Sequence, residues 1–195
     1  MSSPKKRIAI ITNAHPIKDV RIYHKIALSL QKKYEVLILS PNGKSEQINN
    51  VILKRVAGNK IRLLKSLYGE LRNYAPDLVI CVEPLTLIVG LLIKISINCR
   101  IVYDCHEFYP SAFANKFSLP GAAIFARIYN FFEKKMVSLV DGVVTVNSIL
   151  SASFKKFNEN TVVCANYPFF DKNISFEEHE KKYDITYVGL LSRDK

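Results

Sequence analysis

Short runs of valine, isoleucine and leucine alternate along the chain with longer segments whose apolar residues recur at helical spacing. This alternation is typical of βαβ units built around a parallel sheet. Several of the short runs lack alternating polar positions, as expected for strands that are covered on both faces. The predicted strands are Arg7–Thr12, Glu35–Ser40, Val51–Val56, Asp77–Val82, Arg100–Asp104, Gly142–Asn147 and Thr161–Ala165.

Helical segments are predicted between these strands. The first has Asp19 in position to cap its N-terminus, and we expect Val20, Ile26, Ala27 and Leu30 to share its buried side. The pattern predicts an α/β fold class, a Rossmann-like three-layer domain with a mostly parallel sheet of about seven strands. The predicted helices are Asp19–Lys33, Lys60–Tyr74, Leu85–Ile97, Ala122–Leu139 and Ser148–Phe157.

A change of composition near residue 168 marks the predicted end of this domain. The residues that follow include Pro168, Asp171, Asn173 and the charged run Glu177–Lys182, which indicates a linker. A new strand-like run follows at Asp184–Gly189. We therefore expect residues 1–167 to form one domain and 168–183 a linker. Residues 184–195 are then the truncated first strand and turn of a second domain.

The apolar content suits a folded core, but no segment is predicted to cross a membrane. Hydrophobic residues make up 49% of the chain, too many for a disordered protein. The longest apolar stretch, Leu85–Ile97, contains Lys94 and falls short of the ~20 residues that span a bilayer. The four cysteines lack zinc-ligand spacing, so we expect buried free thiols in a reducing cytosol. The predicted location is cytoplasmic, with a peripheral position at the inner face of the membrane as a further option.

The positive charge is concentrated in the first part of the chain. Residues 1–75 hold 15 Lys and Arg against 4 Asp and Glu, whereas the remainder is balanced. Such asymmetry indicates either an anionic partner or a solvated basic surface. The segment Val51–Tyr74 includes the predicted helix Lys60–Tyr74, in which apolar residues form one stripe and basic residues lie largely on other faces. This helix either packs on the sheet or docks to an anionic membrane surface. No recognised nucleic-acid module is present, and a nucleic-acid partner is not expected.

Several common catalytic motifs are absent from the sequence. The glycines form no GxG pair and no GxxxxGK[ST] phosphate loop. The sequence also lacks HExxH and GxSxG. These absences weigh against a dehydrogenase, a P-loop kinase and an α/β-hydrolase.

Polar side chains instead follow the predicted strands at their carboxyl ends, where open α/β sheets bind ligands. Each has a plain structural alternative: Asp19 can simply cap a helix, and Asn147 and Asn166 can simply terminate strands. The run Asp104–Glu107 contains metal-ligand types, but alternate residues of an extended segment point in opposite directions. Carboxylates that orient His106 are the more plausible interpretation, because a histidine needs a partner to fix its tautomer. The candidate site residues are His15, Asp19, Arg21, Asp104, His106, Glu107, Asn147 and Asn166.

An ordered series of segments resembles one branch of the family 4 (group 1) glycosyltransferases. The resemblance covers nearly the whole chain, and its specificity lies in the order of the segments more than in any one of them. The segments are His15–Leu30, Val102–Pro110, Asp141–Asn147, Asn166–Pro168 and Tyr183–Lys195.

The resemblance implies one half of a GT-B enzyme, in which two Rossmann-like domains face each other across a cleft. This half would bind the acceptor, a glycan or lipid-linked saccharide, and the second domain would hold most of the nucleotide-sugar donor. Transfer in this family needs no metal. By the same resemblance, His106 would lie beside the transferred sugar as the catalytic residue. His15, Asp19 and Arg21 would line the acceptor side.

The family's donor-binding groups would lie beyond residue 195, so we expect a hexosyltransferase-type enzyme of which this chain alone is inactive. The first loop also lacks the Gly-Gly pair of many members, which makes phosphate contact there doubtful. Two alternatives stay open. One is a non-catalytic membrane- or partner-docking subunit of a two-chain glycosyltransferase. The other is a fragment of a GT-B-type sugar-nucleotide epimerase.

Overall fold

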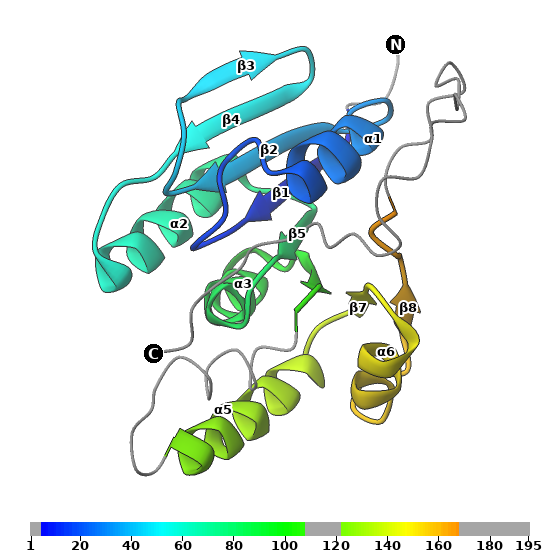
Figure 1. Cartoon of the computed structure of the whole chain (residues 1–195). Coiled ribbons are helices and arrows are strands. Elements are labelled where there is room, and N and C mark those ends of the chain that lie inside the picture. Colours follow the sequence, from blue (N-terminus) through cyan, green and yellow to red (C-terminus); the bar gives the residue numbers. More distant parts are fainter. Residues whose placement is uncertain (1–4, 108–121, 168–195) are drawn as a thin grey trace, which may run out of the picture.

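The structure, a computed structural model, describes residues 5–107 and 122–167 (Figure 1). The predicted linker and the predicted start of a second domain lie outside these residues. The strands are β1 (Arg7–Ile11), β2 (Glu35–Ser40), β3 (Glu46–Ile48), β4 (Val51–Arg55), β5 (Leu78–Cys81), β6 (Arg100–Cys105), β7 (Gly142–Thr145) and β8 (Thr161–Val163). The helices are η1 (Val20–Ala27), α1 (Leu28–Leu30), α2 (Lys60–Tyr74), α3 (Pro84–Ile97), α5 (Ala122–Val137) and α6 (Ser148–Lys155).

The strands form one eight-stranded sheet in the order β3-β4-β2-β1-β5-β6-β7-β8. All seven predicted strands are confirmed, and their pairings with one another are parallel. Without β3, the order is the 3-2-1-4-5-6 order of a Rossmann sheet with one more strand at its end. The predicted α/β class and Rossmann-like architecture are therefore confirmed.

The edge strand β3 was not predicted from the sequence. It pairs antiparallel with β4, and Glu46 and Gln47 are exposed. A three-residue strand with two polar, solvated positions has no apolar alternation by which to recognise it.

Each face of the sheet has its own apolar core, because successive side chains of a strand point to opposite faces. On β1, Ile8 and Ile10 join the core formed with η1. Ala9 and Ile11 join the larger core formed with α2, α3, α5 and α6. Figure 1 shows the sheet running between these helical layers.

The first helix differs from the predicted regular α-helix. The backbone N–H of Leu28 donates to the carbonyl of Tyr23, five residues earlier, which is the hydrogen bond of a π-helix. The wider turn rotates the buried side, so Ile22 and Ala27 are fully buried. Val20 is 60% exposed, and its predicted burial is wrong.

The basic helix α2 packs on the sheet. Its buried residues are Leu63, Leu67 and Leu71, while Leu64 and Tyr68 are half-buried against the same core. The predicted apolar stripe of this segment therefore serves the fold. Within the described ranges, no helix is both long and apolar enough to cross a membrane.

The four cysteines are free, as predicted. Cys81, Cys99 and Cys105 are buried, but Cys164 is exposed, because it lies just after the short strand β8 at the edge of the sheet. The expectation that it would be buried is wrong.

Candidate functional site

The site is built where the strand order reverses. β1 and β5 are adjacent in the sheet, and the chain continues from them in opposite directions. In open α/β sheets the crevice outside the carboxyl ends of such strands is the usual place for a ligand. The residues that follow these two strands are Thr12–Ile17 and Val82–Glu83.

The loop after β1 is held in place by hydrogen bonds to its own backbone. The hydroxyl of Thr12 accepts from the backbone N–H groups of Ala14 and His15 at 3.2 and 3.0 Å. The hydroxyl of Ser40, at the end of β2, donates to the carbonyl of His15 at 2.7 Å. The backbone of His15 is thus held at both its N–H and its carbonyl.

Glu83 lies beneath this loop with only 5% of its surface exposed. One carboxylate oxygen accepts from the hydroxyl of Thr12, and the other accepts from the backbone N–H of Asn13 at 3.0 Å. Burial raises the pKa of Glu83 above its ordinary value, although these two donors and the nearby histidines act in the opposite direction. Glu83 is therefore a buried carboxyl whose charge depends on its neighbours, as is common at functional sites.

The side chains of His15 and His106 meet above Glu83. Their ring centroids are 5.0 Å apart, and their Nε2 atoms lie 3.2 Å apart. Only one of these two nitrogens can carry the shared hydrogen when both rings are neutral. Oε1 of Glu83 lies 3.6 Å from Nε2 of His15, and Oδ2 of Asp19 lies 3.6 Å from Nδ1 of the same ring.

With the shared hydrogen on Nε2 of His15, the hydrogen of a neutral His106 ring lies on Nδ1. Nδ1 of His106 is buried and has no hydrogen-bond partner among the described residues, and the same is true of Oδ1 of Asn13. The two atoms are a donor and an acceptor. A hydroxyl group of a ligand can satisfy either of them.

Asp19 has two contacts. Its Oδ1 accepts from the backbone N–H groups of Arg21 and Ile22 at 2.8 and 3.0 Å, so it caps η1 as predicted. Its Oδ2 lies 3.6 Å from Nδ1 of His15. Asp19 therefore both caps η1 and lies beside the ring of His15.

Arg21 and Asp104 form a buried, two-pronged ion pair, with 5% and 1% exposure. Nε and one terminal nitrogen of Arg21 donate to the two carboxylate oxygens of Asp104 at 2.8 and 2.6 Å. The other terminal nitrogen donates to the carbonyl of Cys164 at 3.3 Å. The pair thus connects η1, β6 and the segment after β8. Arg21 was predicted to line the acceptor side and the Asp104 carboxylate to orient His106, but in the structure these two side chains are bonded to each other.

The run that contains His106 does not gather into a metal site. Asp104 faces η1, whereas Cys105 belongs to the core on the opposite face of the sheet. The thiol of Cys105 donates to the carbonyl of Glu107 at 3.3 Å, and the Glu107 side chain is exposed. No group of three or more potential metal ligands occurs in residues 5–107 and 122–167.

The two predicted asparagines have structural contacts. Oδ1 of Asn147 accepts from the backbone N–H of Leu150 at 2.9 Å and caps α6. Oδ1 of Asn166 accepts from Nζ of Lys25 at 2.6 Å, and the same nitrogen donates to the carbonyl of Tyr167. These bonds fasten the end of the described chain to η1. A role for either asparagine in binding a substrate stays a prediction.

Thr12 and Glu83 were not among the predicted site residues. The signal for Glu83 was present, since it is the one acidic residue in the apolar stretch Leu78–Ile93 and it follows a predicted strand. Its contact with residues 70 positions earlier depends on the pairing of β1 with β5, which local sequence patterns do not specify.

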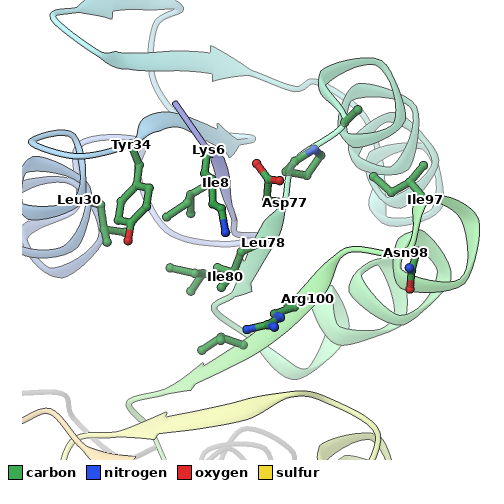
Figure 2. A pocket seen from close by; sticks show the side chains of 13 residues that line it. Lys6, Ile8, Leu30, Tyr34, Asp77, Leu78, Ile80, Ile97, Asn98 and Arg100 are labelled. Carbon is green, nitrogen blue, oxygen red and sulfur yellow. The ribbon is translucent and has the colours of Figure 1, made fainter. Parts of the chain in front are cut away.

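A separate cavity of about 660 Å³ lies at the other end of the parallel strands, away from the histidine pair. Figure 2 shows Leu30 and Tyr34 on one side of it and Ile8 and Ile80 on the sheet, with Lys6, Asp77 and Arg100 around it. It lies at the amino ends of β1, β5 and β6, the edge at which open α/β sheets do not usually bind ligands. The histidine pair is therefore the stronger candidate.

Comparison with known proteins connects this geometry to a family. The model of glycosyltransferase family 4 matches residues 20–166, which is most of the chain; the match includes Glu83 and His106 and begins after His15. The chain belongs to glycosyltransferase family 4. The predicted resemblance is confirmed.

Solved structures with the same fold are GT-B proteins that differ widely in sequence from this family 4 chain. Sucrose-phosphate synthase from Thermosynechococcus elongatus matches with a TM-score of 0.59 and 14% identity, over 83% of this chain and 48% of that one. Alr3699/HepE from Anabaena, in complex with UDP and glucose, matches with a TM-score of 0.57 and 13% identity, over 84% and 45%. UDP-N-acetylglucosamine 2-epimerase from Rickettsia bellii matches with a TM-score of 0.52 and 12% identity, over 82% and 44%.

The chain spans about half the length of these structures. At such identities the similarity shows the fold, which a transferase and an epimerase share. A search of curated protein sequences found no significant match.

Proposed function

We propose that this domain is the acceptor-binding half of a nucleotide-sugar-dependent glycosyltransferase of glycan or lipid-linked saccharide synthesis. The observation that carries the proposal is the contact of His15 with His106 above Glu83, at the switch point of a family 4 domain. A paired histidine and a buried carboxyl at this edge can bind sugar hydroxyls and hold a proton in a defined position.

Within this proposal, His106 is the catalytic residue. Its unpaired Nδ1–H donates to an oxygen of the transferred sugar, and the unpaired Oδ1 of Asn13 accepts from a hydroxyl. Glu83 and Asp19 act through His15, because each lies 3.6 Å from one of its ring nitrogens. They are positioning residues.

The donor is proposed to bind mainly to a second domain. The two cations beside the site, Arg21 and Lys25, are already engaged with Asp104, Asn166 and Tyr167. A leaving diphosphate needs positive charge or oriented donors in the transition state, and these would come from the opposite half of the cleft. The UDP complex of Anabaena HepE supports a nucleoside diphosphate as the leaving group. We expect transfer to need no metal, so activity should persist in the presence of EDTA.

The test compares the 195-residue chain with the protein that carries it together with a donor-binding domain. Both are incubated with radiolabelled UDP-, GDP- and dTDP-hexoses and a membrane lipid and glycan extract. The two-domain protein should move label from one of these donors to an acceptor, and the chain alone should not. Transfer by the chain alone would contradict the proposed division of labour.

The same products distinguish the alternatives. A sugar-nucleotide epimerase would convert the hexose of the nucleotide sugar without any acceptor. A docking subunit would show transfer only after a second polypeptide is added. Either result would replace the proposed function.

A further inference from the structure

Helices α2 and α3 leave an apolar groove between them. They lie side by side on one side of the sheet (Figure 1), and a cavity of about 370 Å³ is bordered by both of them. The last residues of each helix to line it, Tyr68 and Ser96, are joined by a hydrogen bond of 2.7 Å between their hydroxyl groups, which holds the helices at a fixed spacing. We call its apolar lining the α2–α3 groove: Ile61, Leu64, Tyr68, Ile88, Val89 and Leu92.

The shape of the groove suits another helix. Its rim is exposed, with Ile61 at 69% and Leu92 at 52%, whereas Val89 on its floor is 1% exposed. Apolar side chains at intervals of three and four residues form ridges on a helix, and a further helix packs its own ridge into the groove between them. The segment from Ile61 to Tyr68 is about 10 Å long at 1.5 Å per residue, which corresponds to two helical turns.

Unpaired positive charge lies along the α2 side of the groove. Lys65 lines the groove, and Lys60 lies one helical turn before Leu64. Neither lysine is in an ion pair with another residue in the described parts of the chain. Glu70, the single acidic residue of α2, is bonded to Lys54 at 2.6 Å, and α3 contains no acidic residue. The groove therefore complements a negatively charged partner.

We propose that the α2–α3 groove binds an amphipathic helix of a partner protein, with acidic residues beside its apolar side. Apolar side chains at intervals of three and four residues would enter the groove, as in other helix-in-groove complexes, and carboxylates would meet Lys60 and Lys65. A second copy of this chain would bring the same positive charge against the groove, and like charges disfavour association. A bilayer surface would reach the rim but leave the floor at Val89 unfilled. The proposal does not depend on the sugar-transfer function.

The experiment measures the fluorescence anisotropy of labelled designed peptides titrated with the purified chain. The first peptide has about 16 residues, enough to form a helix, with leucines along one side and glutamates beside them. The second has lysine in place of each glutamate, and the third has serine in place of each leucine. The chain should bind the first peptide about tenfold more tightly than either of the others, and added salt should weaken that binding. No binding of the acidic peptide, or equal binding of the acidic and basic peptides, would overturn the proposal.

A pair of matched serine variants of α3 tests the apolar contact. L92S should weaken binding of the acidic peptide about tenfold, because it removes a side chain that the peptide covers. Ile95 lies on the same helix and is 85% exposed, but it does not line the groove. I95S should therefore bind within about twofold of the original chain. Equal effects of the two variants would show that the peptide binds elsewhere.

Two double variants test the charge. K60Q/K65Q should weaken binding about fivefold, because it removes the two exposed charges beside the groove. K155Q/K156Q removes the same charge from exposed lysines of α6 and should bind within about twofold of the original chain. Circular dichroism checks that each variant is folded. If L92S unfolds, the comparison of the lysine pairs decides the proposal, and equal effects of the two pairs would contradict it.

Two further measurements address other occupants of the groove. Analytical ultracentrifugation should show a monomer, and a dimer that L92S dissociates would mean that the groove binds a second copy. Vesicles of phosphatidylglycerol are sedimented with the chain and with K60Q/K65Q. Vesicle binding that needs these lysines, without binding of the acidic peptide, would mean that the groove meets a membrane. Either result would overturn the proposal.

Discussion

Single residues of the site bind one another across long stretches of sequence. Thr12 and Asn13 bond to Glu83, His15 meets His106, and Arg21 bonds to Asp104. In each case, one partner comes from the loop after β1 or from η1. The other partner lies at the end of another strand or directly after it. His15 and His106 are thus surrounded by groups that are already hydrogen-bonded within the fold, as expected of a preorganised site.

The Arg21–Asp104 pair allows a direct test of its structural role. R21M leaves a buried carboxylate without its partner and should lower the free energy of unfolding by about 3–5 kcal/mol. The double variant R21M/D104N removes both charges and should regain most of that loss. Urea unfolding measures both, and a cost of less than about 1 kcal/mol for R21M would contradict a structural pair.

Glu133 predicts a pH dependence of stability. It is 2% exposed and accepts a 2.6 Å hydrogen bond from the hydroxyl of Tyr103, and burial raises its pKa above the ordinary value. From about pH 4.5 up to the higher pKa of the folded state, the folded protein binds the additional proton, so its unfolding free energy falls as pH rises. E133Q removes this loss and still accepts from Tyr103. Its stability advantage over the original chain should therefore grow with pH across this window.

The measurement for Glu133 is urea unfolding of both proteins at steps between about pH 4 and 8. E159Q, which changes an exposed glutamate, is the control and should track the original chain at every pH. A stability difference for E133Q that stays constant with pH would show that Glu133 does not titrate in this window.

At the residue scale, the sequence predicted which residues lie together at the site better than it predicted the role of each one. His15, Asp19 and His106 were predicted from their positions at strand ends and from the family resemblance, and the structure places them together. Glu83 follows a predicted strand but was not among the candidate site residues. Its burial depends on the sheet pairing, which only the folded chain shows.

Elements were predicted where apolar periodicity is strong and missed where it is weak. The seven parallel strands are runs of apolar residues, and five predicted helices were found within a few residues of their expected ends. The three-residue strand β3 and the π-helical geometry of η1 gave no such signal. In the π-helix Ile22 and Ala27 are both fully buried, five residues apart.

Two helical glycines give a matched test of element packing. In α3, a Cβ added to Gly90 would lie 2.5 Å from Sγ of Cys81 and 3.3 Å from a methyl group of Ile101. G90A should therefore lower the free energy of unfolding by about 1–3 kcal/mol, because the strands beneath cannot move away.

In α2, a Cβ on Gly69 would meet nothing within 4 Å. G69A should raise the free energy of unfolding by up to about 1 kcal/mol, since alanine favours the helix over glycine. Thermal unfolding compares the two variants. Equal effects of both would contradict the close approach of α3 to β5 and β6.

At the scale of the whole molecule, the sheet order creates the site. The sequence predicted a parallel sheet but not the neighbours of each strand, and the reversal between β1 and β5 is a property of that order. The reversal brings the loop that holds His15 beside Glu83, and His106 follows the next strand along. The family relationship and the GT-B structures agree with this fold, and this chain spans about half of their length.

The most direct test of the proposed function is the effect of H106A on kcat/KM for sugar transfer, measured in a protein in which this chain is joined to a donor-binding domain. Loss of a group that contacts the transferred sugar should lower kcat/KM about 100-fold or more. H24A changes an exposed histidine of η1 outside the pair and should leave kcat/KM unchanged. Equal activity of H106A and H24A would contradict the proposal that the histidine pair is the transfer site.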